Sequence, residues 1–165
     1  MKKYLGIFMV MFALILSGCG SSAAKQSDKE KVSTKQLIIP KADFYEYVYI
    51  QGLNDEGVPS EDTRMTISDI TIVKDTLALV DRLVVMRPKY EKDIESVKQL
   101  REKGSYILGF GDTKDFRGQT YSIYLLKDGT FYYQDTLGGT EIMYVTIDKH
   151  EDILKEIKEK LNVNF

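Results

Sequence analysis

The chain has no tryptophan, a single cysteine and a single histidine among its 165 residues. One cysteine cannot form a disulfide within the chain, so no such bond supports the fold. One cysteine and one histidine also fall short of the multi-Cys and multi-His sets that bind structural zinc. We therefore expect no metal site and no cofactor.

An excess of positive charge is also missing. The chain holds 23 Lys+Arg against 25 Asp+Glu, and its formal net charge is -2. Lys2 and Lys3 are the only charged residues among the first eighteen, so the rest of the chain has 21 basic and 25 acidic groups. Proteins that bind nucleic acid neutralise phosphates with clustered basic groups. We therefore expect no nucleic-acid partner.

No apolar run is long enough for a permanent membrane span. The longest, residues 5–16, has twelve residues, whereas a helix needs about twenty to cross the hydrocarbon core. It follows two lysines and precedes Ser17 and Gly18, which is the order of a secretory signal: a basic start, an apolar middle and small residues at a cleavage point. Residues 1–18 are therefore predicted to be a signal peptide.

The tetrad Leu16-Ser17-Gly18-Cys19 resembles the lipobox of bacterial lipoprotein precursors. The resemblance implies that Cys19 receives a diacylglyceryl group on its sulfur and becomes the first residue after cleavage. It also implies a protein anchored by palmitate-type acyl chains to the cell membrane and facing its extracytoplasmic side. The alternative is an ordinary signal peptide with a cysteine nearby by chance.

A polar segment separates Cys19 from the first apolar cluster. Residues 20–35 contain one large apolar side chain, Val32, among small and charged ones. Such a segment cannot bury enough surface to offset its ordering entropy, so residues 19–35 are predicted to be the lipidated cysteine and a flexible tether. Residues 36–165 are long enough for one globular domain with its own core.

Within this domain, alternating apolar patterns predict about five strands of a mainly antiparallel sheet. The pair Asp128-Gly129 between two alternating runs indicates a tight hairpin, because both positions tolerate positive φ. Residues 142–146 are a further short candidate strand. The predicted strands cover residues 44–51, 65–72, 105–111, 120–126 and 130–135.

Two principal helices are expected to pack on one face of this sheet. Apolar residues at steps of three and four predict the first over residues 75–86, with Asp75 as N-cap and Pro88 ending it. The last helix is predicted to begin at Asp148, with Glu151 completing a capping box. Residues 89–103 are predicted to be a loop or a short helix. The fold class is therefore α+β.

The order of these motifs resembles a family of small secreted bacterial lipoprotein domains of unknown function. The resemblance covers about residues 36–160 and implies a secreted α+β domain, without an activity or a catalytic residue. The residues that carry it are Glu95-Ser96-Val97, Ser122-Ile123-Tyr124-Leu125, Asp128-Gly129 and Phe131-Tyr132-Tyr133.

No motif predicts catalysis. Residues 109–118 have the glycines and acids of a binding loop, but Asp112 and Asp115 would repel phosphate and Lys114 stands where calcium needs an oxygen. We predict a polar hairpin loop. His150 is predicted to be a surface residue in the first turn of the last helix. The adjacent acid pairs 61–62 and 151–152 point in different directions, so no catalytic pair is predicted.

The chain has 11 tyrosines, and several of them fall in the predicted strands. The alternation places Tyr45, Tyr47 and Tyr49 on one strand face, and Tyr124 and Tyr133 lie on neighbouring strands. A tyrosine buries its ring while its hydroxyl keeps water or a partner, so these five residues form a candidate binding face. The alternative is that the rings cover one another or lie beneath the loop of residues 52–64.

Together these features predict a lipid-anchored binding or accessory module that is not an enzyme. Its expected partners are the membrane, through the anchor, and an envelope protein or cell-wall component. One alternative is a carboxylate-dependent cell-envelope hydrolase, which needs two converging acids. A solute receptor for a transporter is disfavoured, because 130 residues hardly supply two lobes around a ligand.

Overall fold

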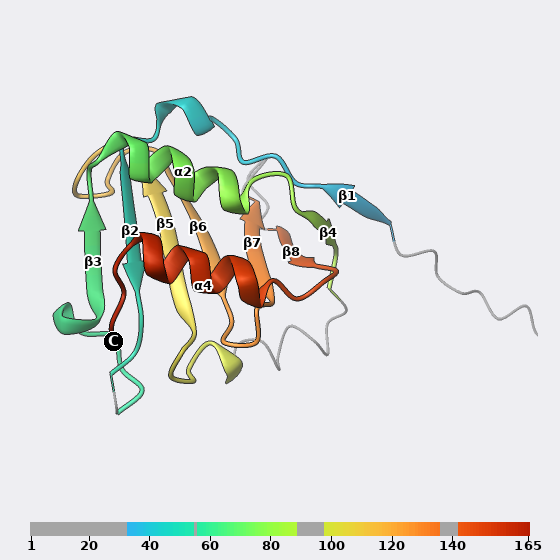
Figure 1. Cartoon of the computed structure of the whole chain (residues 1–165). Coiled ribbons are helices and arrows are strands. Elements are labelled where there is room, and N and C mark those ends of the chain that lie inside the picture. The colour runs from blue at the N-terminus through green and yellow to red at the C-terminus, as the bar shows by residue number, and fades with distance from the viewer. Residues whose placement is uncertain (1–32, 55, 89–97, 136–141) are drawn as a thin grey trace, which may run out of the picture. The chain divides into compact units, whose positions relative to one another are not determined.

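The computed structural model describes residues 33–54, 56–88, 98–135 and 142–165 (Figure 1). The predicted signal peptide, lipobox and Cys19 lie outside the described residues, as do most of the tether and residues 89–97. Within the described ranges, no helix is long and apolar enough to cross a bilayer.

The fold is α+β, with one antiparallel sheet and two helices, as predicted. The sheet has eight strands and not about five, in the order β1-β4-β8-β7-β6-β5-β2-β3. Every pairing in it is antiparallel. The strands are β1 (Thr34–Gln36), β2 (Tyr47–Gln51), β3 (Arg64–Ile67), β4 (Val84–Met86), β5 (Tyr106–Gly111), β6 (Thr120–Leu125), β7 (Phe131–Asp135) and β8 (Ile142–Thr146).

The two strands that sequence patterns miss are the shortest. β1 and β4 have three residues each and pair with one another at one edge of the sheet. Three residues are too few to show an alternation. β1 begins within the predicted tether, and β4 lies within the predicted first helix, so both expectations are corrected at these positions.

The first long helix begins five residues earlier than predicted. Helix α2 spans Ile70–Val80, and its N-cap is Asp69, whose carboxylate accepts the backbone N–H groups of Thr71 and Ile72 at 2.9 and 3.2 Å. Asp75 is therefore not a cap but an exposed residue within the helix. The helix ends before Arg82, which has a φ of 60°, and not at Pro88. The predicted strand over residues 65–72 shortens to β3 for the same reason.

The last helix, α4 (Glu151–Lys160), is where the sequence predicts it but starts later. Its N-cap is His150, whose side chain makes no capping hydrogen bond, so the predicted role of Asp148 is wrong. The His150 N–H donates instead to the carbonyl of Gly129 at 2.7 Å. The helix start is thus tied to the β6–β7 turn, a contact that sequence spacing does not reveal.

That turn confirms the predicted hairpin at Asp128-Gly129. Gly129 has a φ of 80°, and a Cβ there would lie 2.7 Å from the carbonyl carbon of His150. The Asp128 carboxylate accepts the Thr130 N–H at 3.0 Å and pairs with Lys149 at 3.0 Å. Only glycine fits the second position, because both the conformation and the space demand it.

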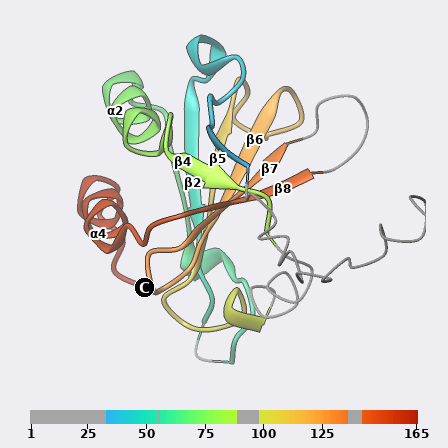
Figure 2. The same cartoon turned by 90° about the vertical axis from the view of Figure 1, so that its right-hand side faces the viewer.

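Both helices lie on the same side of the sheet and form a two-layer domain (Figure 2). Their apolar faces bury the strand residues that point toward them, many of which have no exposed surface. The core includes Val48, Ile50, Leu108, Phe110, Ile123, Leu125, Phe131 and Tyr133 from the strands, and Val73, Leu77, Val80, Leu154 and Ile157 from the helices.

Candidate binding face

The sheet face that points away from the helices is the candidate site, and we call it the outer face. The strand registers align its side chains in rows across the sheet, because directly paired residues of antiparallel strands share a face. One row is Arg64, Gln51, Ile107, Tyr124, Tyr132, Val145, Met86 and Thr34; the next is Thr66, Tyr49, Gly109, Ser122, Gln134 and Met143; the third is Tyr47, Gly111 and Thr120.

Charge is nearly absent from these rows. Charged residues make up 29% of the chain, yet in the three rows of described residues Arg64 is the only charged side chain. Tyrosine, methionine and small polar residues occupy most of the remaining positions. This face therefore offers aromatic rings and neutral hydrogen-bonding groups, and no carboxylate within the rows.

Three of the five predicted tyrosines lie together on the outer face. Tyr47, Tyr49 and Tyr124 are each half-buried, so part of each ring remains accessible. Tyr49 and Tyr124 are separated by two strand spacings and one row, which corresponds to roughly 12 Å between their Cα atoms. The three side chains thus surround the β2–β5–β6 part of the sheet.

The other two tyrosines lie in the core, which corrects the prediction for them. β2 begins only at Tyr47, so Tyr45 precedes the alternation and turns its ring toward Phe110, with 6.1 Å between centroids. Its hydroxyl donates to the carbonyl of Pro40 at 2.9 Å. Tyr133 pairs with Ile123 on the helix side and donates to the carbonyl of Val80 at 2.8 Å.

Burial governs the ionisation of both core tyrosines. Removal from water raises the pKa of Tyr133 far above its ordinary range, with Tyr121 and Asp81 adding to the effect. Burial also raises the pKa of Tyr45, with a smaller contribution from Asp112. Both hydroxyls therefore remain protonated donors in the fold.

Glycines in β5 leave a depression in the outer face that aromatic rings fill. The ring of Tyr49 lies over Gly109, and the ring of Phe116 lies over Gly111. The two rings meet edge to face, with centroids 4.7 Å apart. Phe116 belongs to the polar loop between β5 and β6, which is the hairpin loop predicted for residues 109–118, and it has a φ of 54°.

At one end of the outer face the side chains are buried. Leu126, Tyr132 and Val145 are buried there in a small second apolar cluster, against which Leu100 and Tyr124 pack. In that part of the face Tyr132 is covered largely by aliphatic and methionine side chains. The β2–β5–β6 part, with Tyr47, Tyr49 and Ser122, keeps half-buried side chains.

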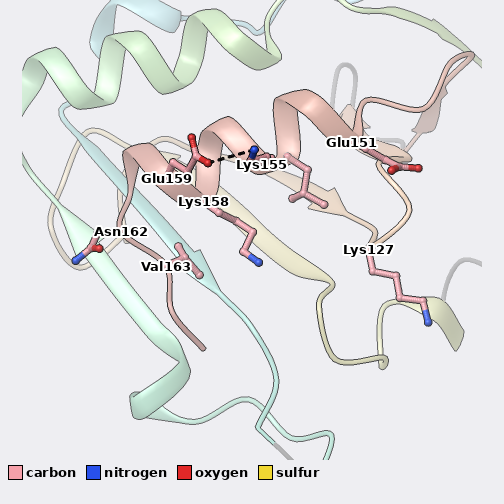
Figure 3. Close-up of a pocket in the computed structure, with 8 residues that line it drawn as sticks. Lys127, Glu151, Lys155, Lys158, Glu159, Asn162 and Val163 are labelled. Carbon is pink, nitrogen blue, oxygen red and sulfur yellow. Dashed lines mark ion pairs between the residues drawn. The ribbon is translucent and has the colours of Figure 1, made fainter.

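A separate groove of about 510 Å³ runs beside α4 (Figure 3). Two of its charged side chains pair with each other, with 3.7 Å between Lys155 and Glu159, and Lys127 pairs with Glu102, which lies outside the groove. Glu151 and Glu159 are eight residues apart on the helix, about 12 Å along its axis. That separation exceeds the carboxylate spacing of glycosidases, so this pair does not suit the hydrolase alternative.

His150 and the acidic side chains of the described residues do not come together in a site. His150 packs its ring against Phe131, with centroids 5.7 Å apart, and is half-buried. Among the described residues, no group of three or more histidine, cysteine or acidic side chains is placed to hold a metal ion.

Comparison with known proteins finds no match among family models, curated proteins or solved structures. The resemblance to small secreted lipoprotein domains therefore stays a prediction.

Proposed function

We propose that this protein is a lipid-anchored, extracytoplasmic binding module whose outer face binds another protein of the cell envelope. The observation that carries the proposal is the composition of the outer face, which has tyrosines, methionines and one arginine but no lysine or carboxylate in its three rows.

This composition is typical of protein interfaces. Their buried centres are enriched in aromatic residues, methionine and arginine, and depleted in lysine, glutamate and aspartate. A half-buried tyrosine suits such a surface, because it adds contact area at low entropic cost and keeps a hydrogen-bonding hydroxyl. With a single cation in its three rows, the face also gives little Coulomb attraction to a charged polymer, which favours a protein partner over a polyanion.

The anchor is the second part of the proposal and is supported by the Leu16-Ser17-Gly18-Cys19 tetrad. Lipidation of Cys19 would concentrate the domain at the membrane. A binding face of low affinity would then still be occupied by a partner held at the same membrane. Metabolic labelling with radioactive palmitate tests this directly. We expect incorporation into the wild-type protein and none into Cys19→Ser; an unlabelled wild-type protein would remove the anchor.

Site-specific photo-crosslinking in cells tests the binding face. A photoreactive amino acid at position 47 or 124 should give a crosslinked protein adduct, because both side chains lie half-exposed on the outer face. Matched controls at Phe44 and Val58, which are 66% and 54% exposed and lie outside the rows, should give none. A charge introduced between the tyrosines, Ser122→Glu, should abolish the adduct. Equal crosslinking from all four positions, or none, would contradict the proposal.

A further inference from the structure

The two edge strands of the sheet differ in how well they are protected against pairing with another chain. β1 and β3 are the outermost strands, and the described residues place no strand beyond either of them (Figure 1). β1 has Lys35 at its centre, and a lysine in an edge strand is a common protection against further pairing. β3 contains neither lysine nor proline. β3 is therefore the less protected edge.

Three backbone groups of β3 point away from the sheet. The Gly52 N–H donates to the Thr63 carbonyl at 2.8 Å, which identifies a hydrogen-bonded pair of the β2–β3 ladder. Because such pairs alternate along an antiparallel ladder, Arg64 and Thr66 direct their N–H and C=O groups away from β2. The Arg64 N–H donates to the Glu61 carbonyl. The outward groups that remain are the Arg64 C=O and both backbone groups of Thr66.

The side chains of β3 give this edge an apolar side and a polar side. Met65 and Ile67 pair with buried residues of β2, so they face the helix layer, where both are half-buried against the core. Arg64 and Thr66 are exposed on the side of the outer face. A strand added beside β3 with apolar side chains toward the helix layer would therefore cover Met65 and Ile67.

Acidic side chains lie near both ends of β3. Glu61 and Asp62 come directly before the strand, and Glu46 lies with Ser68 in a pocket of about 290 Å³ beside its other end. All three acidic side chains are exposed, and within the described ranges none of them forms an ion pair. They attract a segment that has basic residues at its ends.

We propose that β3 binds an extended segment of another protein, which adds a further strand to the sheet and has basic residues at both ends. Main-chain hydrogen bonds supply the affinity of such strand addition, and the flanking side chains supply its specificity. The inference depends on neither the lipid anchor nor the outer-face tyrosines. A second copy of this chain is a poorer occupant, because an antiparallel β3–β3 pair would bring Glu61 and Asp62 of one copy toward Asp69 of the other.

Fluorescence anisotropy with a synthetic peptide tests the proposal. The full chain is purified in detergent, and the probe is a fluorescent peptide in which valine and threonine alternate between two terminal lysines. When it is extended, its valines share the side that would cover Met65 and Ile67, and its lysines reach the acidic ends of β3. We expect saturable binding with a Kd below about 1 mM. N-methylation of the threonines removes the amides that would face β3 and should abolish binding.

Two proline substitutions compare the edges of the sheet. Thr66→Pro removes the outward N–H of β3 and no hydrogen bond to β2, so it should weaken binding at least about fivefold in a folded protein. Thr66→Ala keeps the N–H and should bind as the wild type does. Gln36→Pro is the matched control in β1, where the Leu37 N–H donates to Leu83 and Gln36 therefore faces outward. It should leave binding unchanged. Circular dichroism and thermal unfolding confirm that each variant is folded.

The contribution of charge is tested with Glu46→Gln and Asp62→Asn together. This double variant should bind the lysine peptide about threefold more weakly, because two exposed ion pairs are lost. The charge-matched control is Asp152→Asn with Glu156→Gln, two exposed acids of α4, and should leave binding unchanged. A peptide with glutamate in place of both lysines should bind the wild-type protein more weakly than the lysine peptide does.

Binding of the N-methylated peptide as tightly as the parent peptide would overturn the proposal, because backbone pairing would then not be involved. So would undetectable binding of the parent peptide, an equal loss in Thr66→Pro and Gln36→Pro, or equal binding of the glutamate peptide. A wild-type dimer that Thr66→Pro converts to a monomer in sedimentation velocity would also overturn it, because a second copy would then occupy the edge. The outer-face proposal is tested separately, by crosslinking at positions 47 and 124.

Discussion

The phenol ring of Tyr49 lies directly over the backbone of Gly109 in the neighbouring strand. A Cβ at position 109 would overlap Cε1 of that ring and lie 2.5 Å from Cζ, so the glycine is what allows the ring to lie against the sheet. The Arg64 guanidinium also approaches the ring, at 5.5 Å from its centroid. The Tyr49 ring can therefore lie on the outer face only because residue 109 has no side chain.

The substitution Gly109→Ala tests this relationship. We expect it to destabilise the fold by about 2 kcal/mol, because the added methyl group must displace the Tyr49 ring. Urea unfolding measures the loss. In a Tyr49→Ala background the same substitution should cost at least about 1 kcal/mol less. Equal costs in the two backgrounds would show that the ring is not the obstacle.

The buried hydroxyl of Tyr133 should contribute measurably to stability. Tyr133→Phe removes the donor to the Val80 carbonyl and leaves that acceptor buried, which should cost about 1 to 2 kcal/mol in the free energy of unfolding. Tyr47→Phe removes a hydroxyl from the half-buried outer face and should cost less than about 0.5 kcal/mol. If the two variants are equally stable, the hydrogen bond contributes nothing.

The core tyrosines predict a loss of stability in alkali. Their pKa values are raised in the fold, whereas in the unfolded chain they ionise near their ordinary value of 10.0. The unfolded chain therefore binds fewer protons above about pH 10, and the free energy of unfolding falls as the pH rises. The lowered pKa of Tyr144 acts in the opposite direction. Urea unfolding between about pH 8 and pH 11 should show the fall, with a shallower slope in Tyr133→Phe.

The β6–β7 turn predicts a smaller loss of stability in acid. Burial opposes ionisation of Asp128, but hydrogen bonds from Lys149 and Thr130 outweigh it and lower the pKa of the carboxyl. The stabilisation is present above the unfolded value of 3.8 and disappears as the pH falls through the lower folded value. Asp128→Asn should flatten the stability curve below about pH 4, measured by urea unfolding at a series of pH values.

Much of the sheet could be predicted because its evidence is local. The strands on both sides of Asp128-Gly129 follow from alternation and from a turn that requires glycine. The first helix was misplaced because Asp69 and Asp75 are both plausible caps before apolar periodicity. Choosing between them depends on β4, which exists only because β1 and β8 pair with it.

The sequence by itself determined the α+β class, the central hairpins, the C-terminal helix and the tyrosines of the strands. Only the tertiary structure decided which tyrosines share the outer face, because that depends on where β2 begins and on which side the helices pack. Tyr45 and Tyr133 entered the core, while Tyr47, Tyr49 and Tyr124 stayed opposite it. Alternation separates the two faces of a strand, but the partner layer determines which face is buried.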